Sequence, residues 1–374
     1  MTSKTMRDSR HVALYLWLII LVIGSVCVGL FLVHFRYHAW DFRNNLWGPA
    51  RLLLQGEMPY DPQALEGLSA EWGVPFHLSI WFPTIVGLGL PLGAVPLPNA
   101  ANIWLFLSLT ASLVTVGLVH RVSGPDDSPR ILLSLALVLV AFAPLYAHLR
   151  QGQASLIVLA SVIPAWVLLE HDRASWAGVV LSLSWAKPQL ILFAWPLLAW
   201  LAIEKRQFRA LFGGWLVGSV AQTIPLWILE PGWPAGYLGA LDANPVWLQP
   251  NILSLVTTWS GSPMVGWTAT LLAVATAFAW LAHTWRHHDP VVALSWALAL
   301  TPTISPYTWS YDQVLLLPLL VVILRTARAG PRRTVFWIVF LVCQVVYLAL
   351  RIQTPPDTWY AWFPPVLLLF AALV

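Results

Sequence analysis

The chain has 374 residues, of which 59% are hydrophobic and only 10% are charged, whereas a soluble domain carries about 25% charged residues. This composition excludes a soluble globular protein, because too few polar residues remain to cover a water-exposed surface. The formal net charge of +4 comes from short basic loops, so it marks membrane orientation and we expect no binding to nucleic acid. We therefore predict an all-α, polytopic helical membrane protein, since lipid requires each segment to bond its own backbone.

Twelve apolar segments are candidates for membrane-spanning helices, which need roughly 20 apolar residues with shorter spans tolerated. They are 11–33, 102–120, 131–148, 154–169, 174–187, 189–203, 209–229, 264–283, 290–304, 312–324, 334–350 and 362–374. The first follows a basic stretch, but no small-residue cleavage site comes after it. We expect it to be an uncleaved first helix and not a signal peptide.

Basic clusters and polar motifs alternate along the chain, with one apolar segment between them each time. The basic clusters are Lys4/Arg7/Arg10, Arg121/Arg130, Lys205/Arg206/Arg209, Arg286 and Arg325/Arg328/Arg332/Arg333. With a cytoplasmic N-terminus, the twelve spans place all of them in the cytoplasm, as the positive-inside rule predicts. The segment 81–98 must then not cross, and its prolines and glycines favour a re-entrant or interfacial element. We expect a multi-pass protein of the plasma membrane, the bacterial cytoplasmic membrane.

The bulk outside the bilayer falls on the outer face of this single integral membrane domain, residues 1–374. A first outer loop covers 34–80 and a second covers 230–262, whereas the cytoplasmic loops are all short. Apolar residues at helical spacing predict an amphipathic helix from Asp41 to Gln55, ended by Gly56. Chemistry is therefore expected on the outer face.

Four polar motifs reach that face, and each has a structural alternative. Asp41 opens the amphipathic stretch, where it is either a helix N-cap or a general base at the membrane surface. Arg150 and Gln153 lie in a tight turn, which either stays hydrated or binds sugar hydroxyls and a phosphate. Lys187, followed by a helix-breaking proline, either snorkels to the interface or offers a point charge to a lipid-linked phosphate.

The fourth motif runs from Ser305 to Asp312. Asp312 begins an apolar segment, so it is either an N-cap or a substrate ligand. Tyr307, Trp309 and Tyr311 form either an interfacial aromatic belt or a stacking surface for a sugar ring. The chain has no Walker motif, no GxGxxG and no GxSxG, so nucleotide-dependent chemistry has no support.

The motifs, taken in order, resemble glycosyltransferase family 87, polyprenol-phosphate-dependent enzymes of the GT-C membrane glycosyltransferases. The stretches that carry this resemblance are Asp41-Phe42, 50–56, 59–62, Phe82-Pro83, 90–93, Gly152-Gln153, Ala177-Gly178, Lys187-Pro188, Ser305-Pro306 and Tyr311-Asp312. The resemblance covers about residues 36–325. It implies a GT-C-like fold and an inverting transfer of a hexose, with mannose expected, from a polyprenyl-phosphate donor to a lipid or glycan acceptor.

The same resemblance assigns roles to individual residues. Asp41 matches the acidic residue of the first outer loop that deprotonates the acceptor hydroxyl in GT-C enzymes. Lys187 and Arg150 are then expected to bind the donor phosphate, and Gln153 to orient the sugar. Asn44, Tyr311 and Asp312 complete the candidate substrate-binding set. We expect no metal and no cofactor, because Arg and Lys alone can neutralise a donor that carries a single phosphate.

Two other functions remain open from the sequence. A transporter or flippase of a lipid-linked substrate is expected to show repeated halves and charges deep within spans, and the charges here gather at span ends. A non-catalytic membrane scaffold predicts that no outer-face polar residue matters individually. The oligomeric state is not indicated by any pattern.

Overall fold

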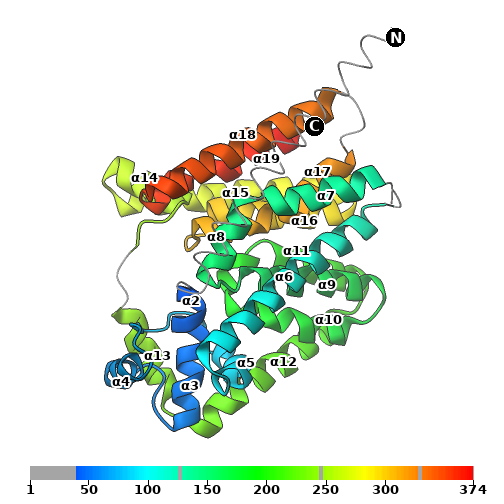
Figure 1. The fold of residues 1–374 in the computed structure, drawn as a ribbon. Helices are drawn as coiled ribbons and strands as arrows, with labels where there is room; N and C mark the ends of the chain where they lie inside the picture. The colour runs from blue at the N-terminus through cyan, green and yellow to red at the C-terminus, as the bar shows by residue number, and fades with distance from the viewer. Residues whose placement is uncertain (1–38, 125–128, 244–246, 327–330, 374) are drawn as a thin grey trace.

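The computed structural model describes residues 39–124, 129–243, 247–326 and 331–373, and every regular element within these ranges is a helix (Figure 1). The elements in chain order are α2 (Trp40–Phe42), η1 (Arg43–Trp47), α3 (Gly48–Gln55), α4 (Pro62–Trp72), α5 (Thr84–Gly93), α6 (Leu97–Val122), α7 (Pro129–Ala141), α8 (Ala143–Gln151), α9 (Ser155–Glu170), α10 (Ala174–Leu181), η2 (Ser182–Ala186), η3 (Pro188–Ile191), α11 (Ala194–Glu204), α12 (Phe208–Leu229), α13 (Trp233–Asp242), α14 (Ile252–Ser260), α15 (Pro263–His287), α16 (Pro290–Ile304), η4 (Ser310–Leu316), α17 (Leu317–Thr326), α18 (Pro331–Gln353), η5 (Asp357–Tyr360) and α19 (Phe363–Leu373). The predicted all-α class is confirmed for the described residues. The first predicted span, 11–33, lies outside them.

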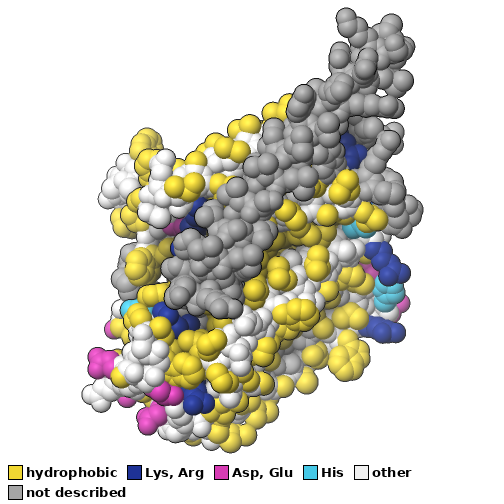
Figure 2. All heavy atoms as spheres, viewed as in Figure 1, with side chains coloured by type: hydrophobic (Ala, Val, Ile, Leu, Met, Phe, Trp, Pro, Cys, Tyr) yellow, Lys and Arg dark blue, Asp and Glu magenta, His cyan; other side chains and the backbone are white. Residues whose placement is uncertain are grey.

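Four helices in the described ranges, α6, α12, α15 and α18, are long and apolar enough to cross a membrane. A fifth span is formed if α7 and α8, which meet at a bend of 52°, are counted together. Their outward side chains are apolar: Phe106, Ile228 and Leu272 are each more than 60% exposed. Figure 2 shows the wide hydrophobic face that results. Water would penalise such a surface, so the chain is a multi-pass membrane protein.

The buried apolar side chains form two separate cores. The larger core joins α6–α12 to α15–α19. The smaller one is built on α2, η1, α3, α4 and α5, with Trp47 at its centre; the Trp47 indole is fully buried and donates a hydrogen bond to the Val95 carbonyl at 2.9 Å. The smaller core also includes Trp104 of α6, Ala186 of η2 and Leu226 of α12, so the two sets of helices meet along a seam at these elements.

The predicted helix 41–55 is present as the continuous run α2–η1–α3, and Gly56 ends it with a φ of 78°. Its five residues Arg43–Trp47 form a π-helix. Arg43, Asn44 and Asn45 on its polar side are buried as well, because the segment 73–83 and α5 cover that side. The helix is therefore an internal element of the fold.

Glycines allow α10 and α12 to pack backbone against backbone. A methyl group on Gly178 would lie 2.0 Å from the Leu211 carbonyl oxygen, and one on Gly214 would lie 1.9 Å from the Ser175 carbonyl oxygen. Real side chains never approach that closely, so both positions require glycine. The tight pair fixes η2, which continues α10 and ends at Ala186, directly before Lys187.

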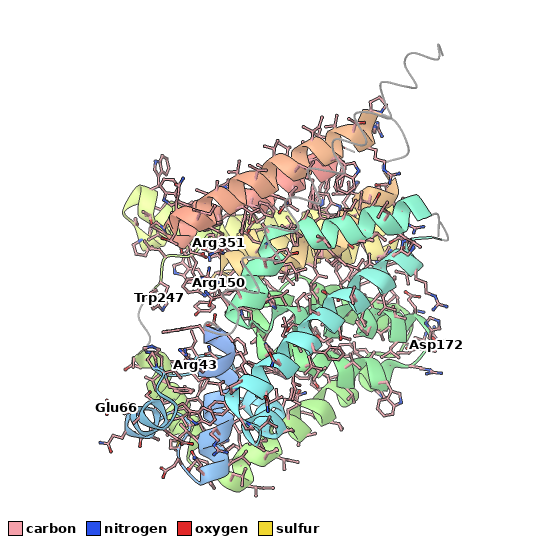
Figure 3. All side chains as sticks on the ribbon, viewed as in Figure 1. Arg43, Glu66, Arg150, Asp172, Trp247 and Arg351 are labelled. Atoms are coloured by element: carbon pink, nitrogen blue, oxygen red, sulfur yellow. The ribbon has the colours of Figure 1, made fainter. Side chains whose placement is uncertain are left out.

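A basic loop and two of the polar motifs lie at opposite ends of α9. Ser155 at the start of α9 donates a hydrogen bond to Asp312, whereas Glu170 at its end pairs with Lys205 at 3.1 Å. A helix of this length spans about 24 Å. Figure 3 accordingly places Asp172, just after α9, at the edge opposite Glu66 and Arg43. The alternation seen in the sequence is thus a spatial separation in the fold.

Candidate active site

A cavity of about 1000 Å³ opens on the side of the molecule that carries the polar motifs. Its wall combines residues of α2, η1, α4 and the 76–82 segment with residues of η2, η3, α13 and the 305–311 loop. The polar and aromatic residues in the wall include Trp40, Asp41, Asn44, Asn45, Trp81, Lys187, Trp247, Tyr307, Trp309 and Tyr311. The cavity therefore forms at the seam between the two sets of helices, and neither set alone encloses it.

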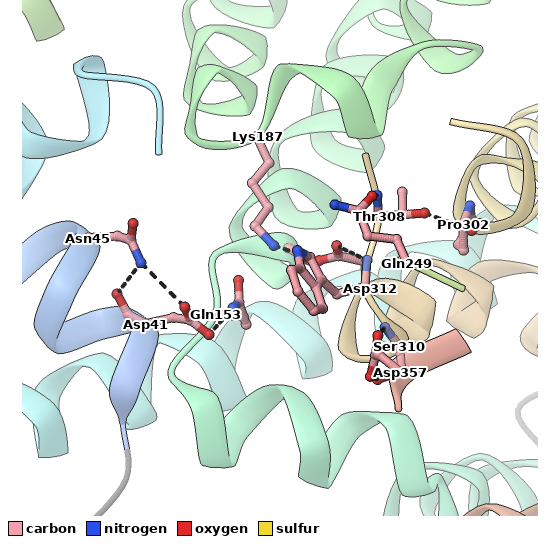
Figure 4. A network of polar contacts seen from close by, with 12 residues as sticks. Asp41, Asn45, Gln153, Lys187, Gln249, Pro302, Thr308, Ser310, Asp312 and Asp357 are labelled. Carbon is pink, nitrogen blue, oxygen red and sulfur yellow. Dashed lines mark hydrogen bonds and ion pairs between the residues drawn. The ribbon is translucent and has the colours of Figure 1, made fainter. Parts of the chain in front are cut away.

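Asp41 presents its carboxylate to this cavity, held by two amide side chains (Figure 4). Gln153 Nε2 donates to Asp41 Oδ2, and Asn45 Nδ2 donates to Asp41 Oδ1 at 3.3 Å and to the Asp41 carbonyl at 3.1 Å. Asn45 is itself fixed, because its Oδ1 accepts from the Ile80 amide at 2.9 Å. Asp41 makes no helix cap: the helix begins at Trp40, and no side chain caps it. The structure thus gives this carboxylate neighbours that orient it toward the cavity.

The surroundings of Asp41 raise its pKa from 3.8 to about 6. Burial of the carboxyl group is the largest cause, because the ionised form loses hydration. Lys187 opposes it most, followed by the hydrogen bond from Gln153. At pH 7 the group is ionised and yet binds a proton far more readily than an exposed carboxylate. A general base needs this combination.

A single glycine brings Gln153 to Asp41. Gly152 follows α8 with a φ of 70°, a left-handed conformation that suits glycine. A methyl group there would lie 2.6 Å from the Phe42 side chain, so the turn packs directly against the residue after Asp41. Trp104 Nε1 donates to the Gly152 carbonyl at 2.9 Å and anchors the turn from α6.

Lys187 and Asp312 form a buried ion pair at the cavity wall. Lys187 Nζ lies 2.7 Å from Asp312 Oδ1, and the side chains are 4% and 0% exposed. Asp312 also accepts from Ser155 Oγ and, at 2.9 Å, from the Trp309 amide. Lys187 faces the cavity, whereas Asp312 is enclosed behind it. Both were predicted as substrate ligands; in the structure Lys187 lines the cavity, whereas Asp312 is not among the lining residues and pairs with Lys187.

An aromatic group lines the cavity next to Lys187. The Trp309 and Tyr311 rings are stacked with centroids 5.9 Å apart, and Trp247 lies 6.0 Å from Trp309. Lys187 Nζ lies 5.0 Å from the Tyr311 ring centroid. Thr308 links the 305–311 loop to the segment before α14, because its amide donates to Gln249 Oε1 at 3.0 Å. Tyr307, Trp309 and Tyr311 all lie in the cavity wall, next to Lys187.

The remaining predicted residues are placed differently. Asn44 lies in the cavity wall, and its Oδ1 accepts from the His77 amide at 3.1 Å. Arg150 is not among the residues that line the cavity; it lies within electrostatic range of Arg351, beside Trp247 in Figure 3. The fold thus gathers Asp41, Gln153, Lys187, Tyr311 and Asp312 around one centre, and leaves Arg150 to one side.

Three residues of this network were not predicted. Asn45 lies one helical turn after Asp41, and that i, i+4 spacing was a usable signal. Ser155 and Gln249 carried no signal, because their partners Asp312 and Thr308 are far away in sequence. Among the described residues, no group of three or more His, Cys, Asp or Glu is placed to hold a metal ion.

Comparison with known proteins identifies the family. The model of glycosyltransferase family 87 matches residues 83–306, more than half of the chain. This range contains Arg150, Gln153 and Lys187, whereas Asp41 and Asp312 lie outside it. We find no match among curated proteins and none among solved structures. The chain therefore belongs to glycosyltransferase family 87 and is a membrane glycosyltransferase.

Proposed function

We propose that the protein transfers a hexose from a polyprenyl-phosphate donor to a lipid or glycan acceptor, with inversion at the anomeric carbon. Mannose is the proposed sugar. The reaction takes place in the cavity at the seam, on the outer face of the plasma membrane. Family membership supports the transferase class. The donor, the acceptor and the stereochemistry are proposed.

The environment of Asp41 is the main support for this proposal. Asp41 is a carboxylate in the wall of a cavity of about 1000 Å³, oriented by Gln153 and Asn45, with a pKa raised to about 6. Structural carboxylates are usually paired with a cation or exposed to water. Asp41 is instead held by two neutral amides, which orient the group and leave its charge available for a proton.

The proposed step is a single displacement. Asp41 takes the proton of the acceptor hydroxyl, and the hydroxyl oxygen forms a bond to the anomeric carbon from the face opposite the phosphate. The bond between that carbon and the phosphate oxygen breaks, and polyprenyl phosphate leaves with the electron pair. Attack from the opposite face gives inversion. The proton on Asp41 is then released to water.

Lys187 is proposed to stabilise the charge that develops on the leaving phosphate. An ammonium group has three N–H donors, and the contact with Asp312 uses one of them. Two remain for phosphate oxygens in a site shielded from bulk water, where such contacts are strongest. Tyr311 and Trp309 next to it offer apolar faces to a sugar ring. Arg150 is proposed to attract the donor at the cavity margin.

The proposed membrane topology has twelve spans and a cytoplasmic N-terminus. The segment 81–98 contains α5, a ten-residue helix that covers about 15 Å, half of the hydrocarbon thickness. This length supports an element that enters without crossing. The separation of basic loops from the cavity along α9 supports a cavity on the outer side.

The test is a transfer assay with purified protein in nanodiscs. It uses radiolabelled polyprenyl-phosphate-mannose, then other polyprenyl-phosphate hexoses, with membrane lipid extract as acceptor. Asp41→Asn is expected to abolish transfer. Asp61→Asn is the matched control, since Asp61 lies on the same outer loop and caps α4 by accepting from the Gln63 amide, a role that asparagine also performs. Normal transfer by Asp41→Asn contradicts the base assignment, and movement of the lipid without sugar transfer favours a flippase.

A further inference from the structure

Arg43 is a buried cation with no counter-ion among the residues that the structure describes. It is 6% exposed, and its Nε and Nη2 atoms are fully covered without a hydrogen-bond partner. Its guanidinium lies 5.0 Å from the Trp40 ring centroid and 5.5 Å from that of Phe76. Aromatic faces attract a cation but accept none of its N–H bonds in full. Burial without such bonds costs free energy. A ligand that accepts hydrogen bonds from Nε and Nη2 would recover this cost.

Asn44 adds a second unused donor at the next position. Its side chain is 2% exposed and lines the cavity. Its Oδ1 accepts from the His77 amide at 3.1 Å, which directs the amide group, while Nδ2 is covered and has no hydrogen-bond partner in the described part of the chain. Asn44 lines the cavity, whereas Arg43 lies behind the Trp40 and Phe76 rings, which belong to the wall. Both side chains have N–H donors without a partner in the described part of the chain.

The backbone at these positions is itself unusual. Arg43 and Asn44 open the π-helix that ends at Trp47, and a π-turn inside an α-helix is often found at a functional site. Both aromatic rings beneath Arg43 belong to the cavity wall. The Trp40 ring is 40% exposed, so it can turn and let the guanidinium reach the cavity. Such rotamer changes commonly accompany binding.

A comparison of Arg43 with Lys187 indicates what Arg43 and Asn44 are suited to bind. The charge of Lys187 is neutralised by Asp312 at 2.7 Å, whereas Arg43 has no carboxylate partner among the described residues. A planar guanidinium beside an amide donor matches the oxygens of a phosphate or a carboxylate. We propose that Arg43 and Asn44 form an anion-binding subsite of the cavity, which takes a phosphate or carboxylate group of a substrate.

The inference deepens the proposed function and rests on it only for the source of the anion. That group is either the lipid phosphate of the donor or an acid group on the acceptor. Asn44 follows Asp41 by three residues, a spacing that puts both side chains on one face of the helix, and both line the cavity, so an anion held at Asn44 lies near the base. Anion binding is measured without turnover, which separates the two proposals. Arg43 can prove unimportant for anion binding while Asp41 is essential for transfer, and Arg43 can bind the anion while Asp41 proves dispensable.

The experiment measures binding to purified protein in detergent by titration and by thermal unfolding. Geranyl phosphate is compared with geraniol, and glucuronate with glucose. At least one anionic probe is expected to bind and stabilise the protein, where its neutral analogue does not. Arg43→Met is expected to weaken that probe tenfold or more. Arg51→Met is the matched control, because Arg51 lies two turns later on the same helix and pairs with Glu71 at 3.8 Å.

The outcomes divide as follows. Loss of geranyl phosphate binding in Arg43→Met assigns the subsite to the donor phosphate, and loss of glucuronate binding assigns it to an acidic acceptor. Without a probe, the melting temperature of Arg43→Met is expected to equal or exceed that of the parent, because an unpaired buried charge is removed. Equal anion binding by the parent and Arg43→Met overturns the proposal. If Arg43→Met does not fold, Arg43→Gln replaces it under the same criteria.

Discussion

Replacing Asp41 with asparagine is predicted to remove activity while stabilising the fold at neutral pH. The substitution keeps the size of the side chain and one oxygen that accepts from Asn45 or Gln153. It removes the negative charge and the ability to take a proton. The two effects arise from the same cause, the burial of a carboxyl group whose ionised form the protein does not fully compensate.

The loss of activity follows from general-base catalysis, which contributes about 10²- to 10⁴-fold, or about 2.7–5.5 kcal/mol of barrier. The parent enzyme is further expected to lose activity as the pH falls through about 6, because the protonated carboxyl cannot accept the acceptor proton. With an unshifted carboxyl group the decline would begin near 3.8.

The gain in stability follows from the same pKa. The Asp41 carboxyl has a pKa of 3.8 when unperturbed and of about 6 in the folded state. Between these values the folded state binds more protons, so the parent loses stability as the pH rises through the interval. The difference between the two pKa values corresponds to a loss of at most about 3 kcal/mol in folding stability at pH 8. Any water that reaches the carboxyl group reduces this loss. Asparagine avoids this cost, so the variant's advantage exists at pH 8 and disappears near pH 4.

The assay is thermal unfolding of the parent, Asp41→Asn and the control Asp61→Asn in one detergent, from pH 4 to pH 8, with transfer rates measured alongside. The control reports the general effect of pH on the micelle and on the fold. An Asp41→Asn variant that is less stable than the parent at pH 8 would refute the account of burial. An activity that is constant between pH 7 and pH 4.5 would refute the raised pKa.

Three further predictions concern the rest of the site. Lys187→Met alone is expected to destabilise the protein by about 3–5 kcal/mol, because it leaves Asp312 buried without its partner, and Lys187→Met with Asp312→Leu to recover most of this in chemical denaturation. Gly152→Ala is expected to cost at least about 1 kcal/mol and to lower transfer, because its methyl group meets Phe42; unchanged melting and activity would contradict this. Trp309→Leu is expected to raise KM for a sugar-bearing substrate about tenfold, as loss of one aromatic stacking contact of up to about 1.5 kcal/mol implies, with kcat changed little in initial-rate kinetics; an unchanged KM would exclude the stacking role.

The sequence by itself determined the class of the protein and much of its local structure. Low charge and long apolar segments require a helical membrane protein, because lipid leaves the backbone no other partner. The helix from Asp41 to Gln55, its end at Gly56 and the turn at Gly152 also follow from local rules of periodicity and backbone freedom. The alternation of basic and polar loops predicted that the two kinds of loop lie at opposite ends of the molecule, because the distribution of charge can be read directly from the sequence.

Only the tertiary structure decided which polar residues act together. Gln153 contacts Asp41 across 112 positions, and Lys187 contacts Asp312 across 125; no local pattern encodes such pairs. The fold also buried Asp312, kept Arg150 out of the cavity wall, and left Arg43 buried without a counter-ion among the described residues. Burial and partnership fix the charge state of a side chain, and both depend on the packing of segments that are far apart in the sequence.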